Sequence, residues 1–313
     1  MATPESLVQL DSVTAAVARH APVDGTHDTP LDGVRLFRVS APVDRVPGVY
    51  DPSVCVVVSG AKHAHHAGRT HVYGPGRYLC TTMPTPVEAE IPRATPDEPV
   101  LGVLIDLEAR PMAELMVQYR AVSSRALAPT LADRRAGPPA ALTVVPWGET
   151  FWSALVRVLE LLDEPRALDL LGHGRLRELH YALVEGPAGV EIRAALSAPT
   201  HEFGSVLTYM RANLDHPLAV EDLAARAGMS RAAFDRHFKA TTGLSPLRYL
   251  KALRLNDAAM LIAGGTDIGV AAAKVGYRNP SQFTREFKRH FGATPRTWVS
   301  TAGHGDPQLL AVS

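Results

Sequence analysis

This chain of 313 residues contains little cysteine, few aromatic residues and no net charge. Its two cysteines cannot supply a disulfide framework, which excludes a small disulfide-stapled scaffold and is typical of a reducing compartment. No stretch approaches the roughly 20 apolar residues of a membrane span, and the first residues lack the basic region and apolar run of a secretory signal. We therefore expect a cytoplasmic protein without a membrane partner.

Recognisable catalytic motifs are missing as well. The chain contains no Gly-x-Ser-x-Gly, no phosphate-cradling glycine loop and no paired array of zinc ligands. We assign no catalytic residue, no metal ligand and no cofactor, and we expect that the protein is not an enzyme.

The zero net charge hides an uneven distribution. Residues 226–296 contain 13 Lys and Arg against 4 Asp and Glu, a net charge of +9, whereas residues 1–199 contain 18 against 23, a net charge of −5. Clustered cations bind a phosphate backbone by releasing its counterions. The carboxy-terminal third is therefore expected to bind nucleic acid.

The same helix-turn-helix pattern occurs twice in this basic part. Helices are predicted over residues 220–227 and 230–239, and again over 268–275 and 279–291, with glycine at each turn to permit the left-handed backbone that ends a helix. Phenylalanines at i, i+4 spacing predict a buried stripe on the second helix of each copy. They are Phe234, Phe238, Phe283, Phe287 and Phe291.

Polar residues begin both second helices. Ser230 and Asn279 can cap the unpaired amides, Pro280 suits the first helical position, and Gln282 can complete a capping box with Asn279. Between the copies, residues 245–262 predict a long helix capped by Ser245. A rigid helix of this kind would fix the distance between the second helices of the two units. It predicts that these two helices enter adjacent major-groove segments on one DNA face, about 34 Å apart.

These residues resemble the AraC/XylS-type transcriptional regulators. The matching motifs include Gly228-Met229-Ser230, Thr242-Gly243, Ser245-Pro246, Val275-Gly276-Tyr277, Ser281-Gln282-Phe283, Arg285-Glu286-Phe287-Lys288 and Phe291-Gly292. The resemblance implies a DNA-binding domain of seven helices that recruits or blocks RNA polymerase at promoters. It also implies base-facing positions at Ala232, Asp235, Arg236, Ser281, Gln282 and Arg285.

Side-chain chemistry ranks these positions. Arginine can pair with guanine O6 and N7, and glutamine with adenine, so Arg236, Gln282 and Arg285 are the best base readers. Ala232 can only touch a thymine methyl group. Asp235 would need a cytosine amino group as its partner or would point away from the DNA, and repulsion from the phosphates favours the second alternative. The expected phosphate contacts are Ser230, Arg231, Lys239, Asn279 and Lys288.

Strand-like patterns dominate residues 33–107 and predict a small barrel or sandwich. Val58-Ser59-Gly60-Ala61-Lys62 and Tyr73-Gly74-Pro75-Gly76 resemble the cupin-like amino-terminal domain of one AraC/XylS subgroup. Helices are predicted over residues 6–19, 111–120, 147–162, 175–184 and 190–196, with a long loop over 121–146.

Two groups of side chains in this part leave alternatives open. His63 and His65 alternate onto one strand face, as a metal site requires, but no glutamate follows at the cupin spacing, and we expect His63, His65, His66 and His71 to be exposed hairpin residues. Cys55 and Cys80 are expected to be buried apolar residues, with a redox-sensing pair as the alternative.

The predicted fold is α+β in two domains. A small cupin-like β-barrel with flanking helices (1–197) precedes an all-α domain of two helix-turn-helix units joined by a long helix (198–303), and 304–313 form a flexible tail. We predict a sequence-specific transcription factor that binds double-stranded promoter DNA and responds to a small-molecule effector. Residues 176–184 could pair two subunits in a homodimer or pack within the chain. The competing functions are a cupin-type metal-dependent enzyme fused to a DNA-binding domain and an architectural DNA binder.

Overall fold

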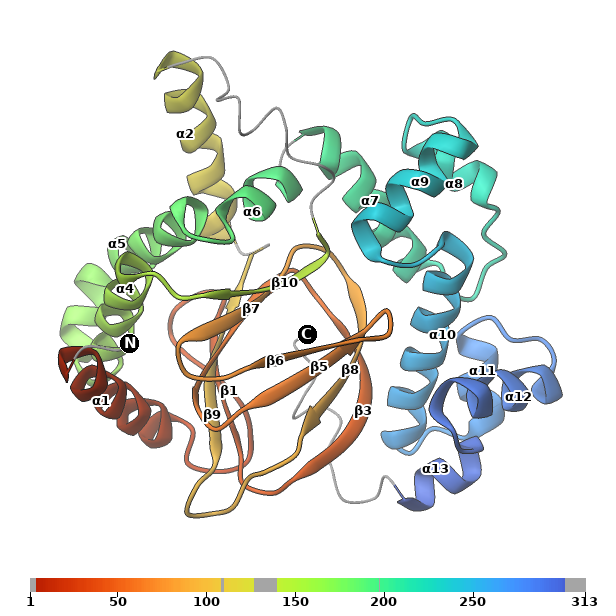
Figure 1. The fold of residues 1–313 in the computed structure, drawn as a ribbon, viewed down its shortest axis with the longest axis horizontal. Helices are drawn as coiled ribbons and strands as arrows, with labels where there is room; N and C mark the ends of the chain where they lie inside the picture. The colour runs from red at the N-terminus through yellow and green to blue at the C-terminus, as the bar shows by residue number, and fades with distance from the viewer. Residues whose placement is uncertain (1–3, 108–109, 127–139, 197, 302–313) are drawn as a thin grey trace.

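The chain forms a β-rich domain, a layer of helices on one side of it, and an all-helical domain on the other (Figure 1). The computed structural model describes residues 4–107, 110–126, 140–196 and 198–301. The expected flexible tail at 304–313 lies outside the described residues, and the expected domain boundary next to residue 197 stays a prediction.

Two antiparallel sheets face each other in the β-rich domain, as the predicted barrel or sandwich requires. The six-stranded sheet has the order β1 (Gly25–Asp28), β2 (Val34–Val39), β9 (Val100–Asp106), β4 (Ser53–Ser59), β7 (Arg77–Thr81) and β10 (Leu142–Pro146). The four-stranded sheet has the order β3 (Val43–Tyr50), β8 (Thr85–Ile91), β5 (Lys62–His66) and β6 (Arg69–Tyr73).

Strand β4 shows why this domain needs so many β-branched residues. Val54, Val56 and Val58 pack into the core under the helices, whereas Cys55 and Val57 pack into the core between the two sheets. Successive side chains point to opposite faces of a strand, so a strand covered on both faces is apolar throughout. The valine run in the sequence therefore marks the centre of the domain.

The helical layer covers the outer face of the six-stranded sheet (Figure 1). Its elements are α1 (Pro4–His20), α2 (Arg110–Ala126), α4 (Glu149–Glu160), the 3-10 turn η1 (Leu161–Asp163), α5 (Pro165–Glu185) and α6 (Gly189–Ala195).

The long loop expected over residues 121–146 is wrong at both ends. Helix α2 continues to Ala126, and residues 142–146 form β10, which pairs with β7. A five-residue strand whose stability comes from pairing with a distant edge strand has too short a pattern to be recognised locally.

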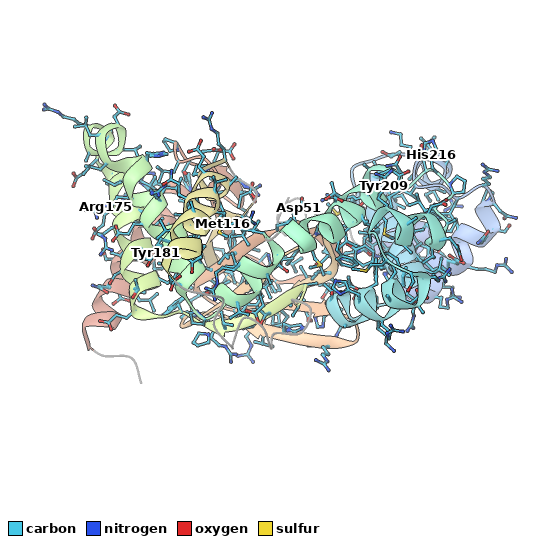
Figure 2. The ribbon with its side chains drawn as sticks, turned by 90° about the horizontal axis from the view of Figure 1, so that it is seen from above. Asp51, Met116, Arg175, Tyr181, Tyr209 and His216 are labelled. Atoms are coloured by element: carbon cyan, nitrogen blue, oxygen red, sulfur yellow. The ribbon has the colours of Figure 1, made fainter. Side chains whose placement is uncertain are left out.

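The side chains considered for a subunit interface lie in the chain's own core. The buried residues are Leu176, Leu179, Leu183 and Val184. The outer face of α5 instead exposes Leu170, Leu171 and Tyr181. Figure 2 places Tyr181 toward one end of the molecule and His216, in the helical domain, toward the other. A homodimer stays a prediction, and any contact through α5 would use this outer face.

Seven helices follow within residues 198–301, as the family resemblance implies. They are α7 (Ala198–Ala212), α8 (Val220–Arg226), α9 (Arg231–Thr242), α10 (Pro246–Ala263), α11 (Ile268–Lys274), α12 (Pro280–Phe291) and α13 (Pro295–Thr301). Helices α9 and α12 end at Gly243 and Gly292, whose φ angles of 74° and 76° are in the left-handed region. Two helix-turn-helix units, α8–α9 and α11–α12, flank α10 (Figure 1).

Helix α10 is buried on most of its surface because it contributes to three contacts. Tyr249 and Leu253 pack into the core of the first unit, and Leu255 and Ala258 pack into the core of the second. The helix also lies against strand β3 of the barrel. Ser245 occupies the predicted N-cap position, but its side chain forms no capping hydrogen bond.

The first unit and the barrel share one apolar core. Val49, Met83 and Ala141 of the β-rich domain belong to the same buried cluster as the aromatic residues of α7 and α9. Beside it, Arg211 of α7 forms an ion pair with Asp51, which Figure 2 shows between the two ends of the molecule.

Two hydrogen bonds from α10 also cross to the barrel. The Tyr249 hydroxyl donates to the carbonyl oxygen of Pro84, and Asn256 Nδ2 donates to the carbonyl oxygen of Gly48 at 2.8 Å. The helical domain is therefore docked on the barrel.

Candidate nucleic-acid interface

The first turn of each recognition helix is held by the predicted cap. Ser230 Oγ accepts from the amide of Ala233 at 3.4 Å, and Asn279 Oδ1 accepts from the amide of Gln282 at 3.1 Å. The reciprocal half of the expected capping box is absent from this second cap. Gln282 Nε2 points instead toward Glu286 Oε1, 3.5 Å away.

The two recognition helices each divide into a buried and an exposed face. Phe234, Phe238, Phe283 and Phe287 are buried, and Phe291 is half-buried, as the apolar stripe predicts. Of the six expected base readers, Asp235 is half-buried and the other five are exposed. All five expected phosphate contacts are exposed.

Arg231 is engaged in a local ion network. Its Nε donates to Asp235 Oδ2 at 2.8 Å, and another guanidinium nitrogen pairs with Glu221 of α8. Asp235 therefore directs its carboxylate along the helix surface to Arg231. A phosphate contact by Arg231 would compete with these two carboxylates.

Glu286 connects α12 to the rest of the domain. Its carboxylate accepts from Lys251 Nζ of α10 at 3.0 Å and from the Tyr277 hydroxyl at 2.8 Å. Burial opposes ionisation of Glu286, but these hydrogen bonds outweigh burial and lower the pKa of its carboxyl. This carboxylate fixes α12 against α10 and faces the side chain of Gln282.

Some basic residues of the helical domain bind other groups of the protein, whereas others are exposed and free to contact DNA. Arg254 donates to the carbonyl oxygens of Leu214 and His216, both at 2.8 Å, and Arg226 stacks on the ring of Tyr209 at 3.8 Å. By contrast, four exposed cations of α9 and α12 form no ion pair with any residue that the structure describes. They are Arg236, Lys239, Arg285 and Lys288, two on each recognition helix.

The barrel contacts the C-terminal end of α9, a feature that local patterns in the sequence do not reveal. His66 Nε2 lies 2.7 Å from the carbonyl oxygen of Thr242, and its Nδ1 lies 2.8 Å from that of Pro86. Both partners are acceptors, and a neutral imidazole has one N–H, so only the protonated ring donates to both. The amide of Ala141 donates to Thr241 O at 2.9 Å in the same place.

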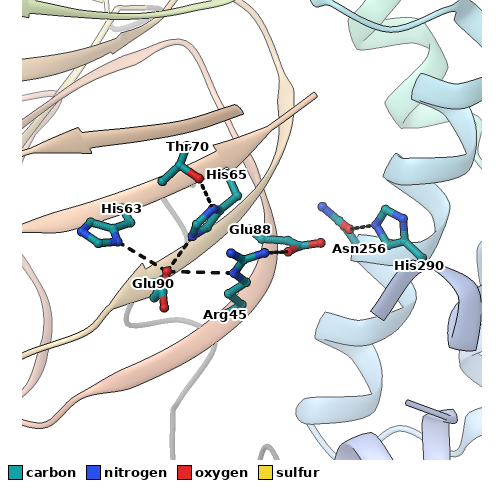
Figure 3. Close-up of polar contacts among 8 residues, drawn as sticks. All are labelled: Arg45, His63, His65, Thr70, Glu88, Glu90, Asn256 and His290. Atoms are coloured by element: carbon teal, nitrogen blue, oxygen red, sulfur yellow. Dashed lines mark hydrogen bonds and ion pairs between the residues drawn. The ribbon is translucent and has the colours of Figure 1, made fainter. Parts of the chain in front are cut away.

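The expectation of exposed hairpin histidines is therefore wrong for His66, which is 9% exposed. His63, His65 and His71 are half-buried. The carboxylate that the sequence seemed to lack is Glu90 of β8, whose Oε2 lies 2.7 Å from His65 Nε2 and 3.4 Å from His63 Nδ1 (Figure 3). It was missed because β8 joins β5 only through the sheet.

The expected burial of both cysteines is confirmed. Cys55 points between the two sheets, whereas Cys80 points to the helical layer. Their side chains lie on opposite faces of one sheet, so they cannot pair as a disulfide without unfolding it.

Lys62 is a third buried group of interest in the barrel. It is 2% exposed, and its Nζ lies 5.3 Å from the ring centroids of both Phe37 and Tyr50. Burial alone would lower the pKa of this lysine, but the neighbouring Tyr50 and Cys55 side chains raise it. The barrel interior therefore contains the amine of Lys62, which lies over two aromatic rings.

Family comparisons cover both parts of the chain. Residues 30–191 match the family described as AraC-type transcriptional regulator N-terminus, and residues 223–301 match a helix-turn-helix domain family. No helix in the described residues is long and apolar enough to cross a membrane.

Individual relatives each match about a third of this chain. The RCS-specific HTH-type transcriptional activator RclR of Escherichia coli is 41% identical over 93 residues, which cover 29% of this chain and 33% of RclR. The multiple antibiotic resistance protein MarA of Salmonella typhimurium is 28% identical over 107 residues, covering 34% of this chain and 84% of MarA. The match to RclR thus spans about a third of that relative.

One solved structure shares the whole fold. ToxT from Vibrio cholerae superimposes with a TM-score of 0.54 at 11% identity, covering 86% of this chain and 98% of ToxT. ToxT with a bound unsaturated fatty acid gives a TM-score of 0.51 at 11% identity, covering 87% of this chain and 96% of ToxT. At this identity the likeness establishes the two-domain fold.

Proposed function

This chain belongs to the family of AraC-type transcriptional regulators, and from that premise we propose that it reads two successive major grooves at a promoter in response to a small-molecule effector. Its family consists of DNA-binding regulators of transcription and not of enzymes. The proposal adds the mode of reading, the effector, RNA polymerase as a partner, and action in the cytoplasm, where promoter DNA is the target.

The observation that carries this proposal is the presence of two exposed cations without ion pairs on each of α9 and α12. Arg236 and Arg285 can each pair with a guanine, and Lys239 and Lys288 can each contact a phosphate. The caps at Ser230 and Asn279 hold the first turn of each reader. Because α10 packs into both units, the spacing between the readers is fixed by a helix and not by a flexible linker.

The docking of the first unit on the barrel supports a role for an effector. A ligand can shift the arrangement of two domains only by binding one arrangement more tightly than another. The barrel contacts α9 and α10 directly, so a ligand in the barrel would act on the readers through these contacts. The buried amine of Lys62, and the fatty acid bound to ToxT of the same fold, support an organic effector with an acidic group.

Selection of bound fragments from genomic DNA by the purified full-length protein tests the proposal. We expect recovered sites to contain two conserved segments separated by one helical turn, about 10–10.5 base pairs. An architectural DNA binder would recover fragments without sequence preference at the same salt concentration. Recovery of random sequences, from protein shown to be folded, would overturn the sequence-specific assignment.

The effector is tested separately with compounds suggested by the genes beside the recovered sites. Carboxylic acids are the first class to try. An effector changes operator affinity or transcription at saturation, whereas a compound that changes neither is excluded. The matched variant Lys62→Met removes the amine and keeps most of the side-chain volume, so it should abolish the response while operator binding without effector persists.

A further inference from the structure

The outer face of the four-stranded sheet brings together three groups that commonly bind transition metals. His63 and His65 project from β5 and Glu90 projects from β8, and their nearest ligand atoms all lie within 4.8 Å of one another. We propose that His63, His65 and Glu90 form a Zn²⁺-binding site on this face of the barrel.

The sheet register explains why these side chains converge. His63 pairs directly with Glu90 across β5 and β8, and His65 follows two positions later on the same face. Neighbouring residues of β8 and β5 that point inward, such as Ala64 and Ala89, are buried in the core. The backbone of the three ligands is thus held by a paired ladder, with the side chains on the opposite face from the core.

The donor set favours zinc over the hard cations. Two imidazoles and one carboxylate suit Zn²⁺, whereas Mg²⁺ and Ca²⁺ prefer oxygen ligands. A tetrahedral Zn²⁺ ion needs donors about 3.3 Å apart. The Glu90 oxygen lies 2.7 Å from His65 Nε2 and 3.4 Å from His63 Nδ1, so small side-chain rotations suffice. Three protein ligands leave a fourth position for water.

Thr70 adds a positioning contact to the site. Its Oγ1 lies 2.9 Å from His65 Nδ1, the ring nitrogen that does not face Glu90 (Figure 3). Metal-binding histidines commonly use the second ring nitrogen in such a hydrogen bond, which fixes the ring orientation. Thr70 belongs to β6, and His65 pairs with it across the ladder. Three strands therefore build the site.

Arg45 competes with a metal ion for the carboxylate of Glu90. It lies 4.0 Å from Glu90 and 4.0 Å from Glu88, and its side chain is 58% exposed. It can keep its contact with Glu88 when a metal takes Glu90. Because like charges repel, Arg45 lowers the affinity of the site for Zn²⁺.

Calorimetric titration of the tag-free full-length protein with zinc chloride tests the proposal, with Co²⁺ absorption as a second readout. We expect one Zn²⁺ ion per chain, no response to Mg²⁺, and visible Co²⁺ bands of a tetrahedral site. His65→Ala and Glu90→Gln should each weaken binding at least about tenfold, and Thr70→Val about tenfold. Arg45→Gln should tighten binding by about two- to fivefold.

His71→Ala is the matched control, because His71 lies on β6 of the same hairpin but pairs with the inward-facing Ala64. It should bind Zn²⁺ like the wild type. Thermal melting without metal shows whether each variant is folded. Absence of stoichiometric binding to the wild type, or an equal loss in folded His71→Ala and His65→Ala, would overturn the site.

Discussion

At the scale of single residues, Arg285 and Lys288 of α12 differ in side-chain geometry and should differ in role. Arg285 and Lys288 are both exposed, but only the guanidinium can pair with both acceptors of a guanine. We expect Arg285→Ala to cost about 1–3 kcal/mol on the preferred site and to relax one base position. Lys288→Ala should weaken all sequences similarly and reduce the salt slope by about 1.

Competition binding on the preferred site, on single-base variants of it and on scrambled DNA measures both effects. Arg289→Ala offers a control for charge alone, since Arg289 is exposed on the same helix and lies 4.0 Å from Glu286. Equal losses on every sequence for Arg285→Ala would show that it contacts phosphate and not a base.

His180 should make the protein sensitive to acid. It is fully buried in α5, neither ring nitrogen has a hydrogen-bond partner in the described structure, and burial lowers its pKa from 6.5 to about 4. In the unfolded chain the His180 ring therefore binds a proton below pH 6.5, whereas in the folded chain it binds one only below about pH 4. This difference leaves stability unaffected above pH 6.5 and destabilises the fold progressively as the pH falls to 4.

Denaturant unfolding at pH 7 and pH 5 measures this effect. His180→Leu should lose about 2 kcal/mol less than the wild type between these two pH values. His173→Leu is the control, because His173 is an exposed residue of the same helix. If the wild type and His180→Leu lost the same stability, the ring would have to be protonated in the folded protein.

At the scale of elements, α10 is a shared part of both helix-turn-helix units and of the contact with the barrel. The Tyr249 ring packs against Phe238 of α9, with ring centroids 5.2 Å apart, while its hydroxyl reaches Pro84 of the barrel. Removing the hydroxyl should weaken docking by about 1–3 kcal/mol, because a buried carbonyl loses its donor, and should leave the core of the first unit intact.

Hydrogen exchange on Tyr249→Phe shows whether docking on the barrel is weakened while the core of the first unit stays intact. Exchange should rise at the beginning of β8 and stay unchanged in α12. Tyr277→Phe is the matched control, since its hydroxyl donates to Glu286 inside the DNA-binding domain. It should affect α12 and not β8. Unchanged exchange at β8 in Tyr249→Phe would mean that this hydrogen bond adds nothing to docking.

Local signals account for most of the elements. Helix α12 has an asparagine cap, a proline at its first position, phenylalanines four residues apart and a glycine end, all within one short stretch, and its predicted bounds agree closely with the structure. Strand β10 has none of these signals and forms because β7 offers an edge. The second half of the predicted capping box failed because Glu286, itself held by Lys251 and Tyr277, offers Gln282 another partner.

At the scale of the whole molecule, the basic residues and the buried apolar clusters are distributed differently over the two domains. The basic excess lies in the part that carries both recognition helices, as its sequence distribution requires. The apolar cores are not divided between the β-rich domain and the helical domain in the same way, because Val49 and Met83 of the barrel pack with the first helix-turn-helix unit. The second unit has its own core. The first unit therefore shares an apolar core with the barrel, whereas the second unit does not.

The sequence by itself determined the family, the two helix-turn-helix units, their capped recognition helices and the strand-rich first domain. These features depend on residues close together in the chain, where spacing maps directly onto a helix face or a strand face. Only the tertiary structure decided that Glu90 joins His63 and His65, that His66 bridges to the end of α9, and that Cys55 and Cys80 face opposite ways. Each of these depends on which strands pair and which surfaces dock, and such long-range contacts leave no periodic trace in the sequence.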